Sequence, residues 1–122
     1  MIGIGIDICE IARIEKLFVK NKTFFTKYYS QEEWEYIQSR GVTAGSSAAA
    51  MFAAKEAFLK AIGSGIAKLS LKDISVLHAP NGRPSYNLSQ KATEYLTEIG
   101  GKRVHLSISH EAGVAVAVAI IE

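Results

Sequence analysis

The opening residues alternate between two kinds of side chain: Ile2, Ile4, Ile6 and Ile8 are separated by Gly3, Gly5 and Asp7. Successive side chains of a β-strand point to opposite faces, so this spacing predicts a strand with isoleucine on one face and an almost bare face opposite. A bare glycine face lets a ligand or another backbone approach closely. Asp7 shares that face, where a carboxylate is costly unless it is paired or binds a metal. The alternative is that Asp7 caps the following helix.

The rest of the 122-residue chain predicts a single domain, 1–122, of mixed helices and strands. Apolar periodicity and capping residues favour helices at about 10–20, 30–39, 47–62 and 89–99. Strands are expected at about 73–78, 85–88, 104–109 and 114–121, with loops at 21–29 and 41–47. This order predicts an α+β fold, with a mostly antiparallel sheet and helices packed against it.

Composition excludes several classes of protein. With 48% hydrophobic and 21% charged residues, the chain is typical of a globular protein. A net charge of +2 is too weak to indicate a nucleic-acid partner. The longest apolar run, Ala112–Ile121, is far shorter than the ~20 residues of a membrane helix, so no membrane association is expected. One cysteine, Cys9, and no signal-peptide pattern favour the reducing cytoplasm.

The predicted helix at 47–62 carries charges in unusual places. Lys55 falls inside its apolar stripe, Glu56 lies at the edge, and Lys60 follows Glu56 by one turn. A lysine in an apolar stripe must extend to solvent or meet an anion. Glu56 and Lys60 also fit an ordinary i,i+4 surface pair. If Glu56 instead faces Asp7, the two carboxylates suit Mg²⁺, whose remaining ligands are usually phosphate oxygens and water.

A polar cluster marks the strand at 104–109. His105, Ser107 and Ser109 alternate onto one face, and His110 follows at the turn. Such a cluster suits contacts to anionic oxygens, or it forms the solvent face of the strand. A G-x-S-x-G nucleophile elbow is missing from the sequence, and Gly3-x-Gly5 lacks the third glycine of a dinucleotide fingerprint. A serine hydrolase and a Rossmann fold are therefore disfavoured.

Three stretches together resemble one enzyme family. Residues 5–14 (GIDICEIARI), 52–63 (FAAKEAFLKAIG) and 105–111 (HLSISHE) are similar to the three motifs of the holo-acyl-carrier-protein synthases. These are small 4′-phosphopantetheinyl transferases. The Gly82-Arg83-Pro84 turn also fits, and the similarity covers essentially the whole chain.

That resemblance implies transfer of 4′-phosphopantetheine from coenzyme A to a serine of apo-acyl-carrier protein, a step of fatty acid biosynthesis, with release of adenosine 3′,5′-bisphosphate. It implies Mg²⁺ held by Asp7 and Glu56, with Lys60 and Lys55 facing the phosphates. It places coenzyme A at Gly63, Ser64, Gly82, Arg83, Pro84, His105, Ser109 and His110. The proton acceptor for the serine remains open among Glu56, Asp7 and a water on the metal.

Some positions depart from the family pattern. Cys9 stands where larger two-lobed relatives often carry a third acidic ligand, and Met51 stands where a basic residue is common. Ser64 replaces the more usual threonine, and residues 41–50 carry no charge. Contacts to the 3′-phosphate of coenzyme A are therefore not assigned to that segment.

Two surfaces suggest partners. Arg13, Lys16 and Lys20 form a basic stripe opposite the apolar face of the first helix, which suits docking of an acidic carrier protein. The strand at 114–121 is apolar on both faces, so one face needs a cover. The resemblance implies a homotrimer with active sites between protomers.

Two alternative functions are a Mg²⁺-dependent nucleotide or pyrophosphate hydrolase and a non-catalytic coenzyme A binding module.

Overall fold

A computed structural model describes residues 1–63 and 68–122. In chain order its elements are β1 (Gly3–Glu10), α1 (Ile11–Lys20), α2 (Lys22–Tyr28), α3 (Gln31–Ser39), η1 (Gly41–Thr43), α4 (Ala44–Ile62), η3 (Leu71–Asp73), β2 (Ile74–His78), β3 (Pro84–Leu88), α5 (Gln90–Glu98), β4 (Val104–Glu111) and β5 (Val114–Ile121). The α+β class is confirmed. One antiparallel sheet has the strand order β1-β5-β4, and β2 and β3 form a separate antiparallel hairpin.

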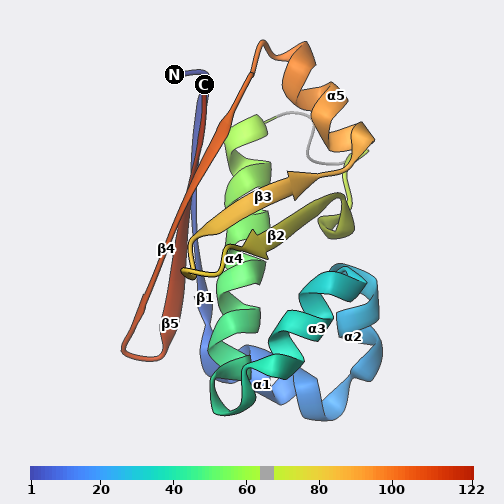
Figure 1. Cartoon of the computed structure of the whole chain (residues 1–122), viewed down its shortest axis with the longest axis vertical. Helices are drawn as coiled ribbons and strands as arrows, with labels where there is room; N and C mark the ends of the chain where they lie inside the picture. The colour runs from blue at the N-terminus through green and yellow to red at the C-terminus, as the bar shows by residue number, and fades with distance from the viewer. Residues whose placement is uncertain (64–67) are drawn as a thin grey trace.

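Helix α4 is the centre of the fold and lies along the inner face of the three-stranded sheet (Figure 1). Its alanines let it approach closely, since Ala53, Ala57 and Ala61 are all buried. A Cβ at Gly5 would collide with the Ala57 carbonyl oxygen, and one at Gly3 with that of Ala61. Helix α4 is therefore the backbone that packs closely against the glycine face of β1.

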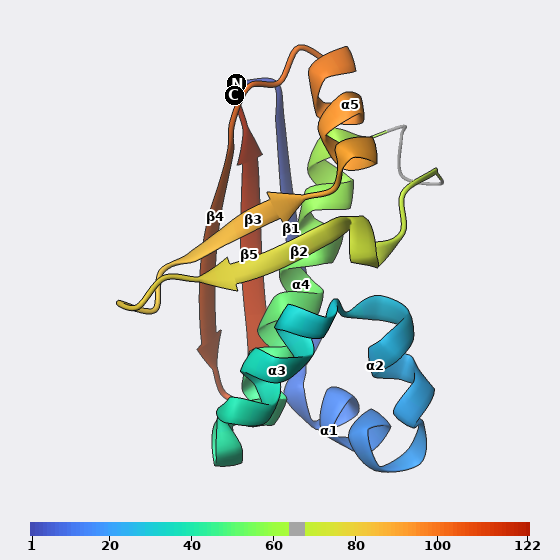
Figure 2. The same cartoon turned by 45° about the vertical axis from the view of Figure 1, so that its right-hand side comes forward.

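The other elements surround α4. The β2–β3 hairpin crosses the helix, and its turn end reaches the β4 edge of the sheet (Figures 1 and 2). Helices α1, α2 and α3 gather around the N-terminal half of α4 (Figure 2). Among the helices of the described residues, none is long and apolar enough to cross a membrane.

Two segments predicted as loops are helical. Residues 21–29 contain α2, whose Phe25 stacks on Phe18 with ring centroids 4.1 Å apart, so tertiary packing outweighs weak local propensity. Residues 41–47 form η1 and the first turn of α4, where Ser46 Oγ donates to the Thr43 carbonyl oxygen. The prediction of a flexible connection there is wrong.

Asp7 lies inside β1, and Glu10 occupies the N-cap of α1, so the capping role considered for Asp7 is wrong. Strand β4 continues through His110 to Glu111, two residues beyond the prediction. The turn to β5 is made by Ala112 and Gly113 with φ of 51° and 82°, which are both left-handed values.

The outer face of the three-stranded sheet is open in this chain. Ile4, Ile6 and Ile8 are 57%, 58% and 61% exposed. They pair in register with Ile120, Val118 and Val116 of β5, which point the same way. No described element covers this face, so the apolar second side predicted for the strand at 114–121 is present.

The Gly5→Ala variant should test how closely α4 must pack. The added methyl meets backbone that has no free space, so we expect a loss of about 3 kcal/mol or more in the free energy of unfolding. Urea denaturation measures the change. Ser85→Ala, at an exposed position of β3, serves as the control and should shift the midpoint little. An unchanged midpoint for Gly5→Ala would contradict the packing argument.

Candidate active site

Two carboxylates and a lysine meet where β1 runs beside α4. Lys60 Nζ donates to Asp7 Oδ1 at 2.9 Å and to the Ile6 carbonyl oxygen at 3.0 Å. The side chain of Asp7 is 19% exposed and that of Lys60 is 52% exposed. Within the described residues no Glu56–Lys60 ion pair forms, so the ordinary i,i+4 surface pair considered from the sequence is not observed.

Glu56 lies half-buried beside this pair. Burial raises the pKa of Glu56, the negative charge of Asp7 raises this pKa further, and Lys60 opposes both effects. A carboxylate with a second acidic side chain beside it suits a cation that the two share. Among residues 1–63 and 68–122, no three His, Cys, Asp or Glu side chains form a metal-binding group. Asp7 and Glu56 could hold a hard cation such as Mg²⁺, which usually takes one or two carboxylates from a protein together with phosphate oxygens and water.

Lys55 points the other way and is completely buried. Its Nζ donates to Glu33 Oε1 at 2.6 Å and to the carbonyl oxygens of Leu71 and Ile74, each at 2.9 Å. Glu33 Oε2 accepts from the Val76 N–H at 3.0 Å. Of the two outcomes expected for Lys55, extension to solvent or contact with an anion, the structure shows the second. Its expected role beside the phosphates is wrong, because Glu33 and two carbonyl groups use all three of its N–H donors.

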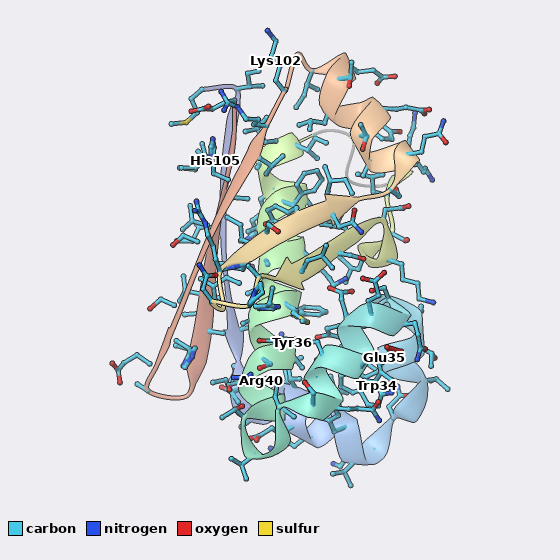
Figure 3. All side chains as sticks on the ribbon, viewed as in Figure 1. Trp34, Glu35, Tyr36, Arg40, Lys102 and His105 are labelled. Atoms are coloured by element: carbon cyan, nitrogen blue, oxygen red, sulfur yellow. The ribbon has the colours of Figure 1, made fainter. Side chains whose placement is uncertain are left out.

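A pocket of about 320 Å³ opens at the β4 edge of the sheet. His110, Gly82 and Pro84 line it, as does Arg40 at the end of α3. Tyr36 forms one wall, and its ring stacks on His78 with centroids 4.1 Å apart. Figure 3 shows Tyr36 and Arg40 close together in this region.

The pocket also contains residues that sequence reasoning missed: Tyr36, Arg40, Thr43, Ser46, Ser47 and His78. They come from α3, η1, α4 and β2, so no local pattern connects them. Burial lowers the pKa of His78, and the positive charge of Arg40 lowers it further. Arg40 and His110 provide cationic or polar groups, while Tyr36 and Pro84 provide apolar surface.

The predicted coenzyme residues are not all brought together in one chain. His105 (Figure 3) and Ser109 point to the outer face of the sheet. His105 Nε2 lies 3.2 Å from Glu122 Oε2. Arg83 is exposed in the β2–β3 turn. Gly63 ends α4 with a φ of 80°, and Ser64 lies outside the described residues.

The basic stripe predicted on the first helix is present on α1. Arg13, Lys16 and Lys20 are exposed, whereas Ile14 on the opposite face is buried. The Arg13 guanidinium lies 3.9 Å from the buried Cys9 thiol, which orients it at the start of the helix.

We expect Lys55→Met to be strongly destabilising. It leaves the Glu33 carboxylate buried without its partner, which costs about 3–5 kcal/mol. The double variant Glu33→Gln, Lys55→Met removes both charges and should recover part of that loss. Urea denaturation of the unchanged chain, the single variant and the double variant measures the loss in the free energy of unfolding. A single variant as stable as the unchanged chain would show that the pair contributes nothing.

Known proteins are similar to this chain along nearly its whole length. Residues 3–119 match the model of the 4′-phosphopantetheinyl transferase superfamily. A relative from Treponema denticola, a holo-[acyl-carrier-protein] synthase, is 45% identical over 122 residues, covering 100% of this chain and 98% of its own. The holo-[acyl-carrier-protein] synthase of Neisseria meningitidis superposes with a TM-score of 0.89 at 34% identity, covering 100% of this chain and 98% of its own.

A third comparison concerns a ligand complex. The Helicobacter pylori holo-[acyl-carrier-protein] synthase, whose structure is a complex with coenzyme A, superposes with a TM-score of 0.82 at 36% identity, covering 98% of this chain and 99% of its own. Since the family model spans nearly the whole chain and the relatives align from end to end, the chain belongs to the 4′-phosphopantetheinyl transferase superfamily, among the holo-[acyl-carrier-protein] synthases.

Proposed function

We propose that this chain transfers 4′-phosphopantetheine from coenzyme A to a serine of apo-acyl-carrier protein and releases adenosine 3′,5′-bisphosphate, with Mg²⁺ as cofactor. The observation that carries this proposal is the meeting of Asp7, Glu56 and Lys60 at the exposed junction of β1 and α4. The reaction would serve fatty acid biosynthesis in the cytoplasm.

Each residue of this group has a role in the proposed reaction. Asp7 and Glu56 would hold the Mg²⁺, which supplies charge neutralisation at the pyrophosphate of coenzyme A. Lys60, on the same side of α4, would neutralise the phosphate oxygens as their charge grows. Either carboxylate lies where it could accept the proton of the carrier serine once that hydroxyl enters the junction.

The adenosine end of coenzyme A would bind in the pocket of a neighbouring protomer. Within one chain Asp7 is on edge strand β1 and His110 is on the opposite edge strand β4, with β5 between them. The open face of Ile4, Ile6 and Ile8 gives a second copy an apolar surface to cover. A closed homotrimer would bury this surface and bring the His110 pocket of one protomer to the Asp7 of the next.

The carrier protein would dock on α1. Arg13, Lys16 and Lys20 present three positive charges on one exposed face, which complements an acidic partner. Arg13, the first residue of the stripe, lies three positions after Glu10, the last residue of β1, so a partner bound there lies near the strand that carries Asp7.

Mass spectrometry of apo-carrier protein tests the function directly. After incubation with coenzyme A and Mg²⁺, we expect the carrier to gain the mass of one phosphopantetheine group. Adenosine bisphosphate released without modified carrier would favour a hydrolase, and no turnover at all would favour a binding module. Either result would overturn the proposal.

Asp7→Ala and Glu56→Ala should each lower kcat/KM by at least ~100-fold, because each removes a metal ligand from a site with two. Circular dichroism should show that both variants remain folded. Glu35→Ala, an exposed carboxylate on α3, is the matched control and should keep full activity. A titration with Mg²⁺ in which either variant reached normal turnover would refute the metal assignment.

Reversing the charge of Arg13 and Lys16 to glutamate should raise the KM for carrier protein about tenfold at low salt, and less at high salt because exposed charges are screened. The KM for coenzyme A should hardly change. The control is the double reversal of Lys91, in α5, and Lys102, after α5, because both are exposed and the net charge changes equally. Figure 3 shows Lys102 at the end of the molecule far from α1. Equal effects of both double variants would argue against docking on α1.

Mixing two inactive variants tests the shared site. Asp7→Ala and His110→Ala damage different halves, so a mixed oligomer has some interfaces at which both halves are intact. Random assembly of equal amounts should restore about a quarter of normal activity. Mixing Asp7→Ala with Glu56→Ala, which damage the same half, should restore almost none. Sedimentation that shows an active monomer would end the trimer proposal.

A further inference from the structure

Lys60 already occupies one oxygen of the proposed metal ligand Asp7. Its ammonium group lies 2.9 Å from Asp7 Oδ1 and donates a second hydrogen bond to the Ile6 carbonyl oxygen at 3.0 Å. A divalent cation would bind the same carboxylate, and the positive charge of the ammonium group beside it repels that cation.

We propose that Lys60 is an exchangeable counter-ion of Asp7: a divalent cation displaces its ammonium group, and the released lysine then binds the substrate phosphates. This inference rests on the proposed function, because it assumes that Asp7 binds a metal. It adds a competition between two cations of different kinds for one carboxylate.

The surroundings of Lys60 make this exchange feasible. Its side chain is 52% exposed, and within residues 1–63 and 68–122 its three N–H donors have two acceptors. Lys55, on the same helix, shows the opposite arrangement, since it is fully buried and all three of its donors are used. The Lys60–Asp7 contact is therefore a half-exposed ion pair that costs little to break, whereas breaking the Lys55–Glu33 contact would leave a buried charge unpaired.

Charge balance favours the exchange in one direction. Asp7 and Glu56 carry two negative charges when both are ionised, whereas Lys60 supplies one positive charge. A divalent cation balances both carboxylates. The displaced ammonium group gains a new anionic partner when phosphates arrive, so metal and coenzyme should each favour binding of the other.

Manganese binding, followed by electron paramagnetic resonance without coenzyme A, tests the competition. We expect Lys60→Met to bind Mn²⁺ roughly two- to fivefold more tightly than the unchanged chain, as expected for loss of a half-exposed ion pair. Lys60→Arg keeps the charge and should restore the original affinity. Lys91→Met, which lowers the net charge equally but lies on α5, should leave the affinity unchanged. Equal or weaker binding by Lys60→Met overturns the proposal.

Chemical labelling gives a second readout. Mg²⁺ should increase the acetylation rate of Lys60, measured by peptide mass spectrometry, while Lys91 in the same sample should not respond. In Asp7→Asn the Lys60 rate should be high without Mg²⁺ and unaffected by it. A Lys60 rate that Mg²⁺ does not change in the unchanged chain overturns the proposal. Neither experiment measures group transfer, so a failed transfer assay with positive results here would remove only the proposed function.

Discussion

The close contact of α4 with β1 is the constraint on which the site depends. Carbonyl oxygens of Ala57 and Ala61 occupy the space that side chains at Gly5 and Gly3 would need. Asp7 follows Gly5 on the same face of the strand, and Glu56 precedes Ala57 on the helix. A wider spacing between helix and strand would separate the two carboxylates. Residues without functional groups therefore determine the distance between the residues that have them.

The buried ion pair of Lys55 and Glu33 holds α4 from its other side. Lys55 and Glu56 are neighbours, and successive residues of a helix point about 100° apart, so one faces the core and the other the candidate site. Glu33 closes the capping box of α3 through the Ser30 N–H and also binds the Val76 N–H of β2. A single carboxylate thus joins three elements, and one of them, α3, carries Tyr36 and Arg40 to the pocket.

Local patterns predicted much of this structure, and the errors lie where distant residues decide. The helix predicted at 30–39 is present and begins with a capping box of Ser30 and Glu33, yet nothing in that spacing indicates that Glu33 also binds Lys55, 22 residues away. Helix α2 was missed because its stability comes from aromatic packing, as between Phe18 and Phe25. The alternation at His105 and Ser109 correctly indicated a shared face, but strand register decides that this face is the outer one. The pocket could not be predicted, because its lining comes from separate elements.

The two faces of β1 have different roles, and this links the proposed assembly to the proposed chemistry. Asp7 points to the inner face, while its neighbours Ile6 and Ile8 point outward and remain exposed. A register shift of one residue would exchange these faces, placing isoleucine against α4 and the carboxylate on the open sheet. The glycines prevent that shift, since only they fit beneath α4. The sequence alternation that admits the helix therefore also directs the apolar side chains to the surface where a second copy of the chain would cover them.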